Sequence, residues 1–477
     1  MGQRTKIPLT LATGVVHDRS VSSQRLLNMY AEKMPDNAKE PAELITREGL
    51  YPIASVGELS GDATDGIRMM QELDGKLYVA SGTELYSLDA SLNATPVGNI
   101  GTTQSIQSAT DGDSLAMALD DGDFYTLYNG AFGVTPFPDG SLVGDLAFLA
   151  GRYVASLQGT GQFRVSALLN PTDWPGALLF TAEYMPDNIT GLIEFRGDLW
   201  IFGQHTTEIW GATAATDAPF QRLQSGINNV GCIGRDTIAK DKARLYWVST
   251  DREVMSANSY SPERISTHAV EKILMEAGDA LADAYSFCYT LRGHDFYVLT
   301  IPGVKTLVYD STTKLWHERD TFGRPEWLAA AAILFGDRLI AAEGFHGNRL
   351  FSVEADWAYD GNATTGVELV REVCFPTVSA DDASITYDKV FADIFAADGV
   401  IKVETDPLVM LQWSDDGGRR WGNWHIRSIG RRGAYIRRVI WRSLGQSRQR
   451  IFKLRMSTPI KLSISALVAD VELNGDG

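Results

Sequence analysis

Cysteine is scarce in this chain of 477 residues, and the three that occur, Cys232, Cys288 and Cys374, lie far apart. An odd and sparse set argues against a disulfide framework. The longest apolar run, residues 327–335, is far shorter than the roughly 20 residues that a membrane-spanning helix needs. The N-terminus lacks the sustained apolar core and small-residue cleavage site of a signal peptide. We therefore predict a soluble protein that folds in a reducing compartment, with three buried thiols and no membrane anchor.

Catalytic and metal-binding motifs are also missing. The seven histidines do not pair at ligand spacing, no cysteine pair has zinc spacing, and there is no His-Glu-x-x-His. Neither a Walker A loop nor a Gly-x-Ser-x-Gly nucleophile elbow is present. The acidic cluster Asp120-Asp121-Gly122-Asp123 lacks the spacing of a calcium loop and predicts a hairpin turn. We expect no catalytic residue, no metal and no cofactor, and predict that the protein is not an enzyme.

Acidic residues are absent from one long stretch, although they dominate the chain as a whole. The formal net charge is −17, from 60 acidic and 43 basic residues. Residues 417–469 contain no Asp or Glu but hold thirteen of the basic residues, which leaves 30 basic against 60 acidic residues elsewhere. An acidic body joined to a basic C-terminal module is informative about partners and not about fold.

What the sequence does contain is a repeat. A Gly or Asp turn leads into an alternating apolar strand, then a tight polar turn, then a second strand rich in Leu, Tyr or Trp. The copies lie at residues 74–88, 112–128, 150–166, 196–210, 243–255, 293–309 and 336–352. Their spacing of about 40–50 residues is the period of a propeller blade. Each copy is a hairpin that cannot bury its apolar face alone, and stacking around an axis solves this. We predict an all-β protein with a β-propeller of about seven blades, six to eight being possible, within residues 62–356.

The segments on either side have other patterns. Residues 1–61 are weakly periodic and predict an extended N-terminal arm that wraps the body or a neighbour. Alternating strands at 385–395, 409–413, 436–441, 451–456 and 460–468 predict a sandwich-like module. The predicted domains are the arm (1–61), the propeller (62–365) and a basic C-terminal β module (366–477). One short amphipathic helix is expected at 268–277, with Thr267 as its N-cap.

One motif invites an enzymatic interpretation. Residues 414–421 fit the Asp-box pattern Ser-x-Asp-x-Gly-x-x-Trp, which occurs in sialidases and some other propellers. In that motif the polar residues tie a hairpin turn to the backbone, remote from catalysis. A glycosidase also needs a carboxylate pair or a nucleophile in a pocket, and the sequence offers no candidate. We favour the structural interpretation of this motif.

The basic stretch admits three interpretations. The first is an ordinary solvated face, although thirteen cations without an anion would repel one another in a monomer. The second is a nucleic-acid-binding surface with interleaved aromatic residues. The third is a surface that docks onto acidic protein. We favour docking, including docking onto the acidic body of a neighbouring copy, because arginine forks bidentately to carboxylates and would alternate outward along a strand. The candidate interface residues are Arg431, Arg432, Arg437, Arg438, Arg442 and Trp441.

Three segments carry a resemblance to a known family. They are residues 25–32 with 44–50, residues 191–203 with 206–210 and 269–273, and residues 411–418 with 437–445. With these segments the chain resembles the tail nozzle proteins, also called tail hub or packaged-DNA stabilisation proteins, of short-tailed bacteriophages. The family usually has Pro-Gly near residue 49, whereas this chain has Glu48 in place of the proline.

The resemblance implies a structural protein of the virion tail, made in the bacterial host cytoplasm. It implies a ring, of about six copies, that extends the DNA channel below the portal and adaptor, retains packaged DNA and allows its ejection. The implied partners are other copies of the chain, the head-to-tail adaptor, a tail needle or plug, tail fibres or tailspikes, and passing double-stranded DNA that is not read by sequence. The acidic body fits, since a DNA conduit should repel phosphate.

Two alternatives belong to other classes. A glycan-binding or glycan-hydrolysing propeller would need a convergent pocket with paired carboxylates. An interaction scaffold of the kelch or WD-repeat type would show Gly-Gly pairs or Trp-Asp blade ends, which the sequence lacks.

Overall fold

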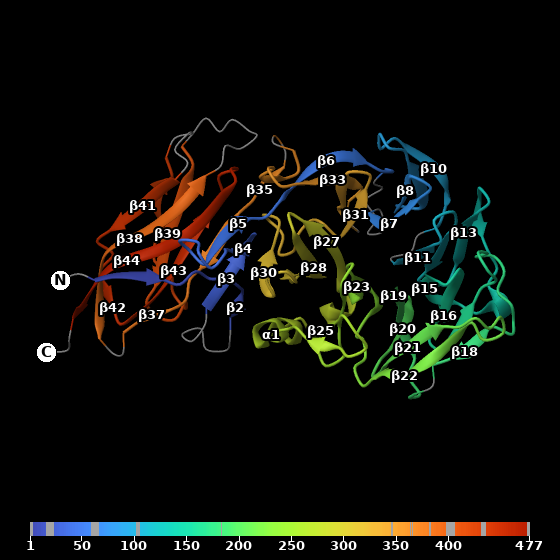
Figure 1. Cartoon of the computed structure of the whole chain (residues 1–477). Coiled ribbons are helices and arrows are strands. Elements are labelled where there is room, and N and C mark those ends of the chain that lie inside the picture. The colour runs from blue at the N-terminus through green and yellow to red at the C-terminus, as the bar shows by residue number, and fades with distance from the viewer. Residues whose placement is uncertain are drawn as a thin grey trace.

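The computed structural model describes residues 3–15, 23–58, 66–101, 105–182, 184–344, 347–362, 364, 366–380, 383–396, 406–430 and 436–474. The molecule is elongated, with a ring of β-sheets at one end and a second β module at the other (Figure 1). Within the described residues the α-helix α1 (His268–Glu276) stands alone beside three short 3-10 helices, η1 (Pro138–Gly140), η2 (Arg235–Thr237) and η3 (Gly278–Asp283). The predicted helix is confirmed, and the Thr267 side chain caps it by accepting a hydrogen bond from the Val270 backbone N–H.

Six sheets of the ring are each built from four strands that follow one another in the chain and pair antiparallel. They are β7 (Ile67–Leu73), β8 (Lys76–Ser81), β9 (Glu84–Leu88) and β10 (Ala94–Asn99); β11 (Ile106–Thr110), β12 (Leu115–Leu119), β13 (Phe124–Tyr128) and β14 (Ala131–Val134); β15 (Val143–Leu149), β16 (Arg152–Leu157), β17 (Gln162–Val165) and β18 (Leu179–Thr181); β19 (Ile189–Phe195), β20 (Asp198–Gly203), β21 (Thr207–Ala212) and β22 (Phe220–Asn228); β23 (Ala239–Lys240), β24 (Leu245–Val248), β25 (Val254–Ala257) and β26 (Glu263–Arg264); and β27 (Tyr285–Leu291), β28 (His294–Ile301), β29 (Lys305–Asp310) and β30 (Leu315–Arg319).

The first hairpin of the ring shows why the repeat folds in this way. Asp74 and Gly75 form the turn between β7 and β8 with positive φ angles of 48° and 68°. A two-residue hairpin turn requires such angles, which Gly adopts without strain and Asp tolerates. The alternation of β8 then buries Leu77 and Val79. Neighbouring sheets share their cores, because Leu85 of β9 lies in one cluster with residues of β12 such as Met117.

A composite sheet closes the ring. β31 (Ala331–Phe335), β32 (Arg338–Ala342) and β33 (Arg349–Glu354) follow one another, and the fourth strand, β6 (Gly49–Ser55), comes from the N-terminal segment and pairs antiparallel with β33. The short β34 (Tyr359–Asp360) and β35 (Val367–Glu368) extend this sheet. The prediction of about seven blades, with six to eight possible, is thereby corrected to six blades of four consecutive strands, and this composite sheet closes the ring. The hairpin at 336–352 has no outer strand of its own and borrows residues 49–55, which lie outside the predicted range.

The C-terminal module is a sandwich of two β layers, which confirms the predicted architecture. The strand order in one layer is β4–β5–β44–β38–β41, with β1 beside β44 and β42 beside β38. The order in the other layer is β3–β36–β43–β39–β40, with β2 beside β3 and β37 beside β43. The strands are β1 (Gln3–Ile7), β2 (Gly14–Val15), β3 (Ser23–Leu27), β4 (Met29–Lys33), β5 (Ala42–Thr46), β36 (Arg371–Cys374), β37 (Val378–Ser379), β38 (Ser384–Ala396), β39 (Leu408–Ser414), β40 (His425–Ser428), β41 (Ile436–Arg442), β42 (Gln446–Ser447), β43 (Gln449–Met456) and β44 (Leu462–Asn474).

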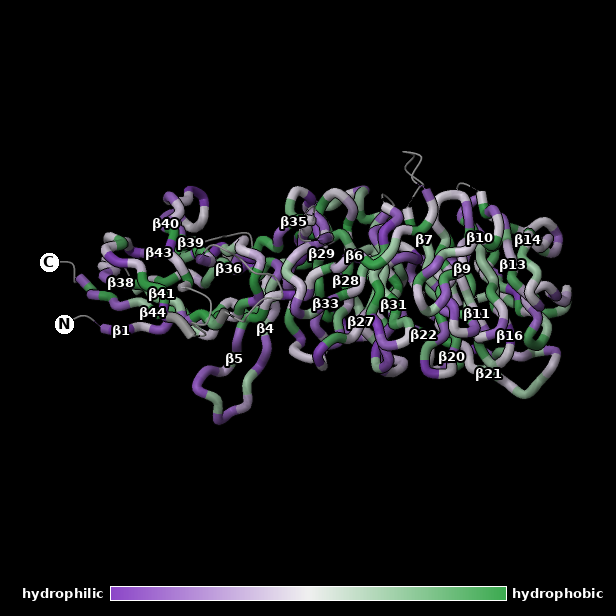
Figure 2. The backbone as a smooth tube through the Cα atoms, turned by 90° about the horizontal axis from the view of Figure 1, so that it is seen from above, coloured by the Kyte–Doolittle hydropathy of each residue, from purple (hydrophilic) through white to green (hydrophobic). Residues whose placement is uncertain are grey.

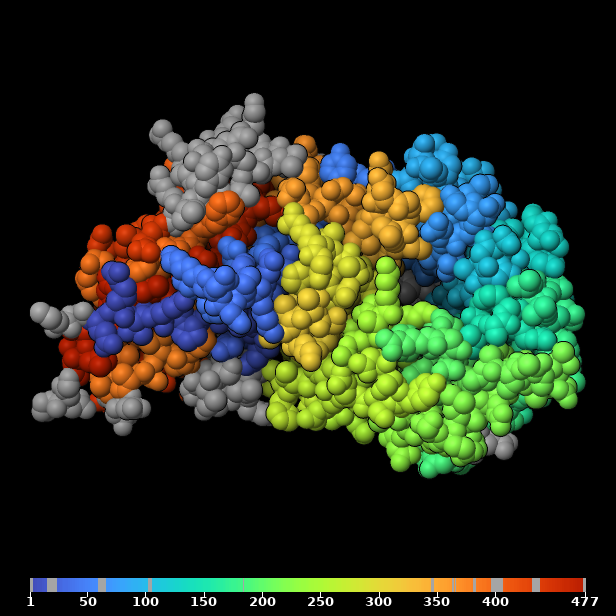
Figure 3. Space-filling model, viewed as in Figure 1, coloured from blue at the N-terminus to red at the C-terminus, as the bar shows by residue number. Residues whose placement is uncertain are grey.

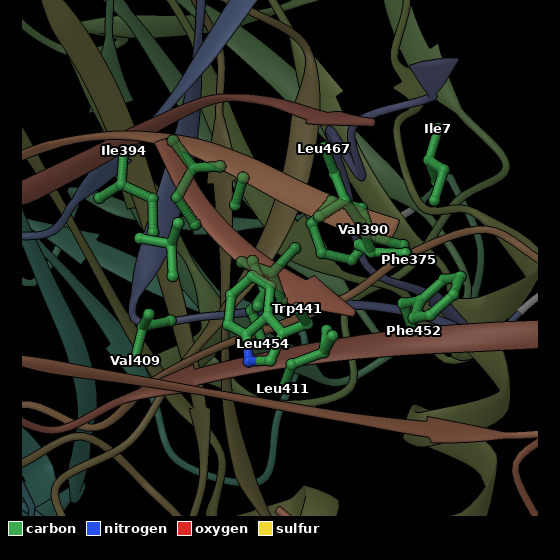
Figure 4. Close-up of a cluster of buried hydrophobic side chains, with 14 of the residues drawn as sticks. Ile7, Phe375, Val390, Ile394, Val409, Leu411, Trp441, Phe452, Leu454 and Leu467 are labelled. Atoms are coloured by element: carbon green, nitrogen blue, oxygen red, sulfur yellow. The ribbon is translucent and has the colours of Figure 1, made fainter. Parts of the chain in front are cut away.

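The core of the sandwich lies between these layers (Figure 4). Val390 and Leu467 from one layer share it with Leu411, Phe452 and Leu454 from the other. All five are fully buried, at 0% exposure. At about 25 cal/mol per Å² of apolar surface removed from water, this interior is the main stabilising contribution to the module.

The N-terminal segment contributes strands to both modules. β1 pairs with β44 of the sandwich, and β6 belongs to the ring. Between them, β3 pairs in parallel with β30 of the ring and antiparallel with β36 of the sandwich, so that one eleven-stranded sheet runs through both bodies. The segment predicted as an arm is therefore largely strand. The predicted domain limits at residues 61/62 and 365/366 stay predictions.

Candidate functional site

The arginine-rich strand β41 was the predicted interface, and Arg438 is its best-defined member. Its guanidinium forms a bidentate pair with Asp393 of β38, with Nε–Oδ1 at 2.8 Å and the second nitrogen at 3.0 Å from Oδ2. It also lies 4.3 Å from the centroid of the Phe391 ring. Arg438 thus already has a carboxylate within its own chain, so it is less available to a partner than a free arginine.

The other predicted interface residues divide into three groups. Arg442 is exposed at the end of β41, as predicted for an outward position. Trp441 is instead a core residue, 1% exposed, and its indole Nε1–H donates to the His425 carbonyl oxygen at 2.7 Å. It lies on the opposite face of the strand from Arg438 and Arg442, because side chains alternate along a strand. Arg431, Arg432 and the side chain of Arg437 lie outside the described residues.

The Asp-box residues form a hairpin turn between β39 and β40. The Ser414 hydroxyl donates to Asp416 Oδ1 at 2.8 Å and accepts from the Gly418 N–H at 2.9 Å. Asp416 Oδ1 also accepts the backbone N–H groups of Arg419 and Arg420, at 3.0 and 2.8 Å. The Ser414 hydroxyl and Asp416 Oδ1 thus bind each other and backbone N–H groups of their own turn, so these contacts are structural.

The densest group of buried charges lies where the ring meets the sandwich. Arg47 follows β5, is 0% exposed, and pairs with Asp360 of β34, which is also buried, at 2.7 Å. Its remaining donors reach the Asn28 side chain at 2.8 Å and the Asp320 carbonyl oxygen at 3.0 Å. Arg47 thus contacts three segments that are distant in the sequence. Separating the buried pair would leave an uncompensated charge, so these segments are held together firmly.

Glu48, the residue that replaces the family's usual proline, is the second centre of this junction. It is 2% exposed, and its carboxylate accepts hydrogen bonds from Arg319 and from the Tyr289 hydroxyl. Burial alone would raise the pKa of Glu48, but the Arg319 charge, the Tyr289 hydrogen bond and Arg47 outweigh it and lower the pKa to about 2. Nearby, burial and the charges of Arg319 and His294 hold the pKa of His317 well below its usual range, so that imidazole is neutral.

A groove with a volume of about 1030 Å³ lies beside the junction, between the β4–β5 hairpin, the β38–β44 layer and Arg292 and Asp356 of the ring. The loop of that hairpin projects from the molecule (Figure 2). Most charges in the groove are already paired, as in Arg292–Asp356 at 3.0 Å and Arg438–Asp393. Burial lowers the pKa of Lys461, at the floor, to about 7, and its ammonium donates to the Arg47 carbonyl oxygen. Because most of its charged side chains already have partners within the chain, the groove does not indicate which class of ligand it would bind.

The described ranges contain neither a metal-binding cluster nor a membrane-spanning helix. No group of three or more His, Cys, Asp or Glu side chains in them has the arrangement to hold a metal ion. No described helix combines the length and apolarity that a membrane crossing by helix would need.

Two family models match this chain. The model described as "Bacteriophage P22 Gp10, beta-propeller" matches residues 6–343, and the one described as "Bacteriophage P22 Gp10, beta-sandwich" matches residues 372–472. The propeller match includes the N-terminal strands β2–β5, which lie in the sandwich, and ends before β33 of the ring, whereas the sandwich match covers nearly all of β36–β44.

Individual proteins are similar to a lesser degree. The tail hub protein gp10 of Salmonella phage P22 is 25% identical over 369 residues, which are 70% of this chain and 71% of that protein. Among solved structures, the extracellular domain of a hybrid two-component system from B. thetaiotaomicron has a TM-score of 0.43 at 10% identity, over 64% of this chain but only 39% of that one. The Neurospora crassa Pan2 WD40 domain has a TM-score of 0.42 at 10% identity, over 68% of this chain and 98% of that one. The two family matches span both modules, and the chain therefore belongs to the bacteriophage P22 Gp10 family of tail hub proteins.

Proposed function

We propose that this chain is a structural component of a phage tail, located in the virion and made in the bacterial host cytoplasm. The observation that carries the proposal is the family match over both modules, together with the relative that is named a tail hub protein. In this proposal about six copies form a ring that extends the DNA channel below the portal and adaptor. The ring retains packaged DNA and lets it pass at ejection.

The charge of the chain supports a conduit role. Outside residues 417–469 there are 60 acidic and only 30 basic residues. A wall of this charge repels phosphate, so that DNA passes without sticking and without its sequence being read. The proposed protein partners are further copies of the chain, the head-to-tail adaptor, a tail needle or plug, and tail fibres or tailspikes.

The junction supports a load-carrying role. One sheet continues from ring to sandwich through β3, and the pairs Arg47–Asp360 and Glu48–Arg319 are buried beside it. A shared sheet and desolvated charge pairs resist hinge motion, because moving the modules apart would expose strand edges and separate buried charges. A tail part that holds packaged DNA under pressure needs such a fixed geometry. We accordingly propose no catalytic role: the protein acts through shape and charge.

Electron microscopy of the native particle that contains this protein tests the proposal. We expect density for the chain in a ring below the adaptor, with an open axial channel. A single free subunit with a closed polar pocket on the propeller axis would contradict the proposal, and glycan-turnover assays would then test the carbohydrate alternative.

A further inference from the structure

The basic stretch at 417–469 has an acidic counterpart at the other end of the molecule. Residues 77–151 contain nine acidic residues and no Lys, Arg or His. They run from β8 to β15 and so form most of two neighbouring sheets of the ring. Of these sheets, β11–β14 lies at the end of the ring that faces away from the sandwich (Figures 1 and 3). That end, here called the acidic tip, carries local negative charge, whereas the basic stretch lies in a module whose charges nearly balance, with 16 basic and 14 acidic residues in 366–477.

Several carboxylates at the acidic tip form no ion pair, although the Arg68 guanidinium of β7 interacts electrostatically with Asp120 and Asp121. Of the acidic residues in 77–151, Asp139 and Asp145 form ion pairs, with Arg164 and Arg235. The turn between β12 and β13 carries Asp120, Asp121 and Asp123, here called the acidic loop. All three are exposed and none is ion-paired within the described ranges; the contacts of Asp120 and Asp121 are to the Ser105 and Asp123 N–H groups.

The acidic loop has an apolar neighbour. Leu142 is 48% exposed and packs over Gly122, where an added Cβ would lie 2.5 Å from Leu142 Cδ2. The carboxylates beside Leu142 give this part of the surface a negative charge that a cationic protein surface would complement.

A matching surface lies on the β39–β40 hairpin. In the described part of 417–469 the ion-paired side chains are Arg438, Arg450 and Lys453. Arg419, Arg420 and Arg427, here called the arginine hairpin, are exposed and form no ion pair with a described side chain, although Arg420 interacts electrostatically with Asp416. Within the described residues, the Arg427 guanidinium donates hydrogen bonds to the carbonyl oxygens of Ile426 and Ile440.

This hairpin also has the form of a contact surface. β40 is exposed at all four positions and ends the strand order of its layer. Ile426, beside Arg427, is 50% exposed. A loop beside β40 projects from the sandwich (Figure 2). The arginine hairpin therefore presents exposed guanidinium groups on a hairpin that also exposes Ile426, as the acidic loop presents exposed carboxylates close to Leu142.

We propose that the arginine hairpin of one copy docks on the acidic loop of the next copy, head to tail, in the ring. This deepens the proposed function and rests on it. Such an interface is heterologous, since different patches of the two copies meet, and heterologous contacts of identical chains close into a ring when the rotation between copies allows it. Opposite charges on the two patches set the order of the copies and disfavour contacts between patches of the same sign.

Charge-reversal variants of the full chain test this contact. The acidic-loop variant carries Asp120→Lys, Asp121→Lys and Asp123→Lys, and the arginine-hairpin variant carries Arg419→Glu, Arg420→Glu and Arg427→Glu. Self-association is measured by sedimentation velocity at about 0.1 M salt, where charges interact over about 10 Å, and at about 1 M salt, where the range falls to about 3 Å. We expect wild-type association to weaken at high salt and each variant to associate at least about 100-fold more weakly than wild type at low salt.

A six-substitution variant that combines both sets restores opposite charges and should recover association. This recovery distinguishes a lost contact from a misfolded subunit. The matched control carries Asp217→Lys, Asp251→Lys and Asp337→Lys, exposed positions outside the two acidic sheets, and should associate like wild type or better.

Two results would overturn the inference. One is a single-set variant that associates like wild type; the other is a wild type that stays monomeric at low salt. If micrographs of the particle still show the ring, either result refutes this contact and leaves the proposed function standing. If the particle shows no ring, the proposed function fails as well.

Discussion

The buried pair of Glu48 and Arg319 offers a sharp test of how ring and sandwich are held together. Glu48→Gln preserves the shape of the side chain and one acceptor oxygen but removes its charge. Arg319, which is 0% exposed, then has no counter-ion beside it. Its remaining neighbours include the Trp327 ring, 4.7 Å away, which attracts a cation but does not neutralise it.

The expected loss can be worked out from the pKa of Glu48. Its value is 4.5 for the unperturbed carboxyl and about 2 in the folded chain, where burial is outweighed by Arg319, Tyr289 and Arg47. This difference in pKa corresponds to about 3 kcal/mol, at about 1.4 kcal/mol per pH unit. This agrees with the roughly 3–5 kcal/mol that is lost when one partner of a buried pair is removed.

The lowered pKa of Glu48 also determines how the stability of the folded chain depends on pH. Because the folded-state pKa is lowered, the stabilisation is fully present above about pH 4.5 and is lost as the pH falls toward about 2. Glu48→Gln should therefore be about 3 kcal/mol less stable than wild type near neutral pH, and the gap should narrow at about pH 3.

Urea unfolding followed by tryptophan fluorescence at the two pH values measures both effects. Glu253→Gln is the matched control, because Glu253 pairs with Arg264 at 2.9 Å on the surface, with 32% of its own side chain and 47% of that of Arg264 exposed. The stability of the Glu253→Gln variant should stay close to that of wild type, because water and salt screen a surface pair of this kind. Equal losses for the two variants, or a Glu48→Gln loss that does not change with pH, would refute the reasoning.

Three further predictions concern the junction and the sandwich. Burial lowers the pKa of Lys461 to about 7 from 10.5, so wild type should gain stability as the pH rises between these values, and Lys461→Met should abolish that gain in thermal melts. Ser414→Ala removes the donor to Asp416 and the acceptor for the Gly418 N–H, and should cost about 1–2 kcal/mol in urea unfolding. Trp441→Ala should cost about 3–5 kcal/mol by leaving a cavity in the sandwich core, and near-ultraviolet circular dichroism would report the loosened packing.

The local part of the fold could be predicted from the sequence. The Asp74-Gly75 turn, the alternation that buries Leu77 and Val79, and the Thr267 cap are all decided within a few residues. The origin of β6 could not, because residues 49–55 carry no mark that assigns them to a hairpin about 300 positions later; only pairing across the whole chain decides it.

The buried junction was missed for the same reason. Glu48 stood out as a departure from the family pattern, but nothing near it points to Arg319, 271 positions away. The partners Arg47 and Asp360 are 313 positions apart. Trp441 is a different case, since the alternation that turned Arg438 and Arg442 outward already assigned Trp441 to the inner face. Applying the two-residue alternation of side chains along the whole strand would have placed Trp441 in the core and not at the interface.

The pairing of β1 with β44 has a consequence for synthesis. Residues 3–7 pair with residues 467–471 and leave the ribosome more than 450 residues before them. At about 5–20 residues per second, roughly 23–93 s separate the two. During that interval β1 has no partner strand, and β6 also waits for β33. The sandwich therefore cannot be completed until β44 has been synthesised, and a chain cut short anywhere before β44 would leave β1 as an unpaired edge, prone to aggregation or proteolysis before it could enter an assembly.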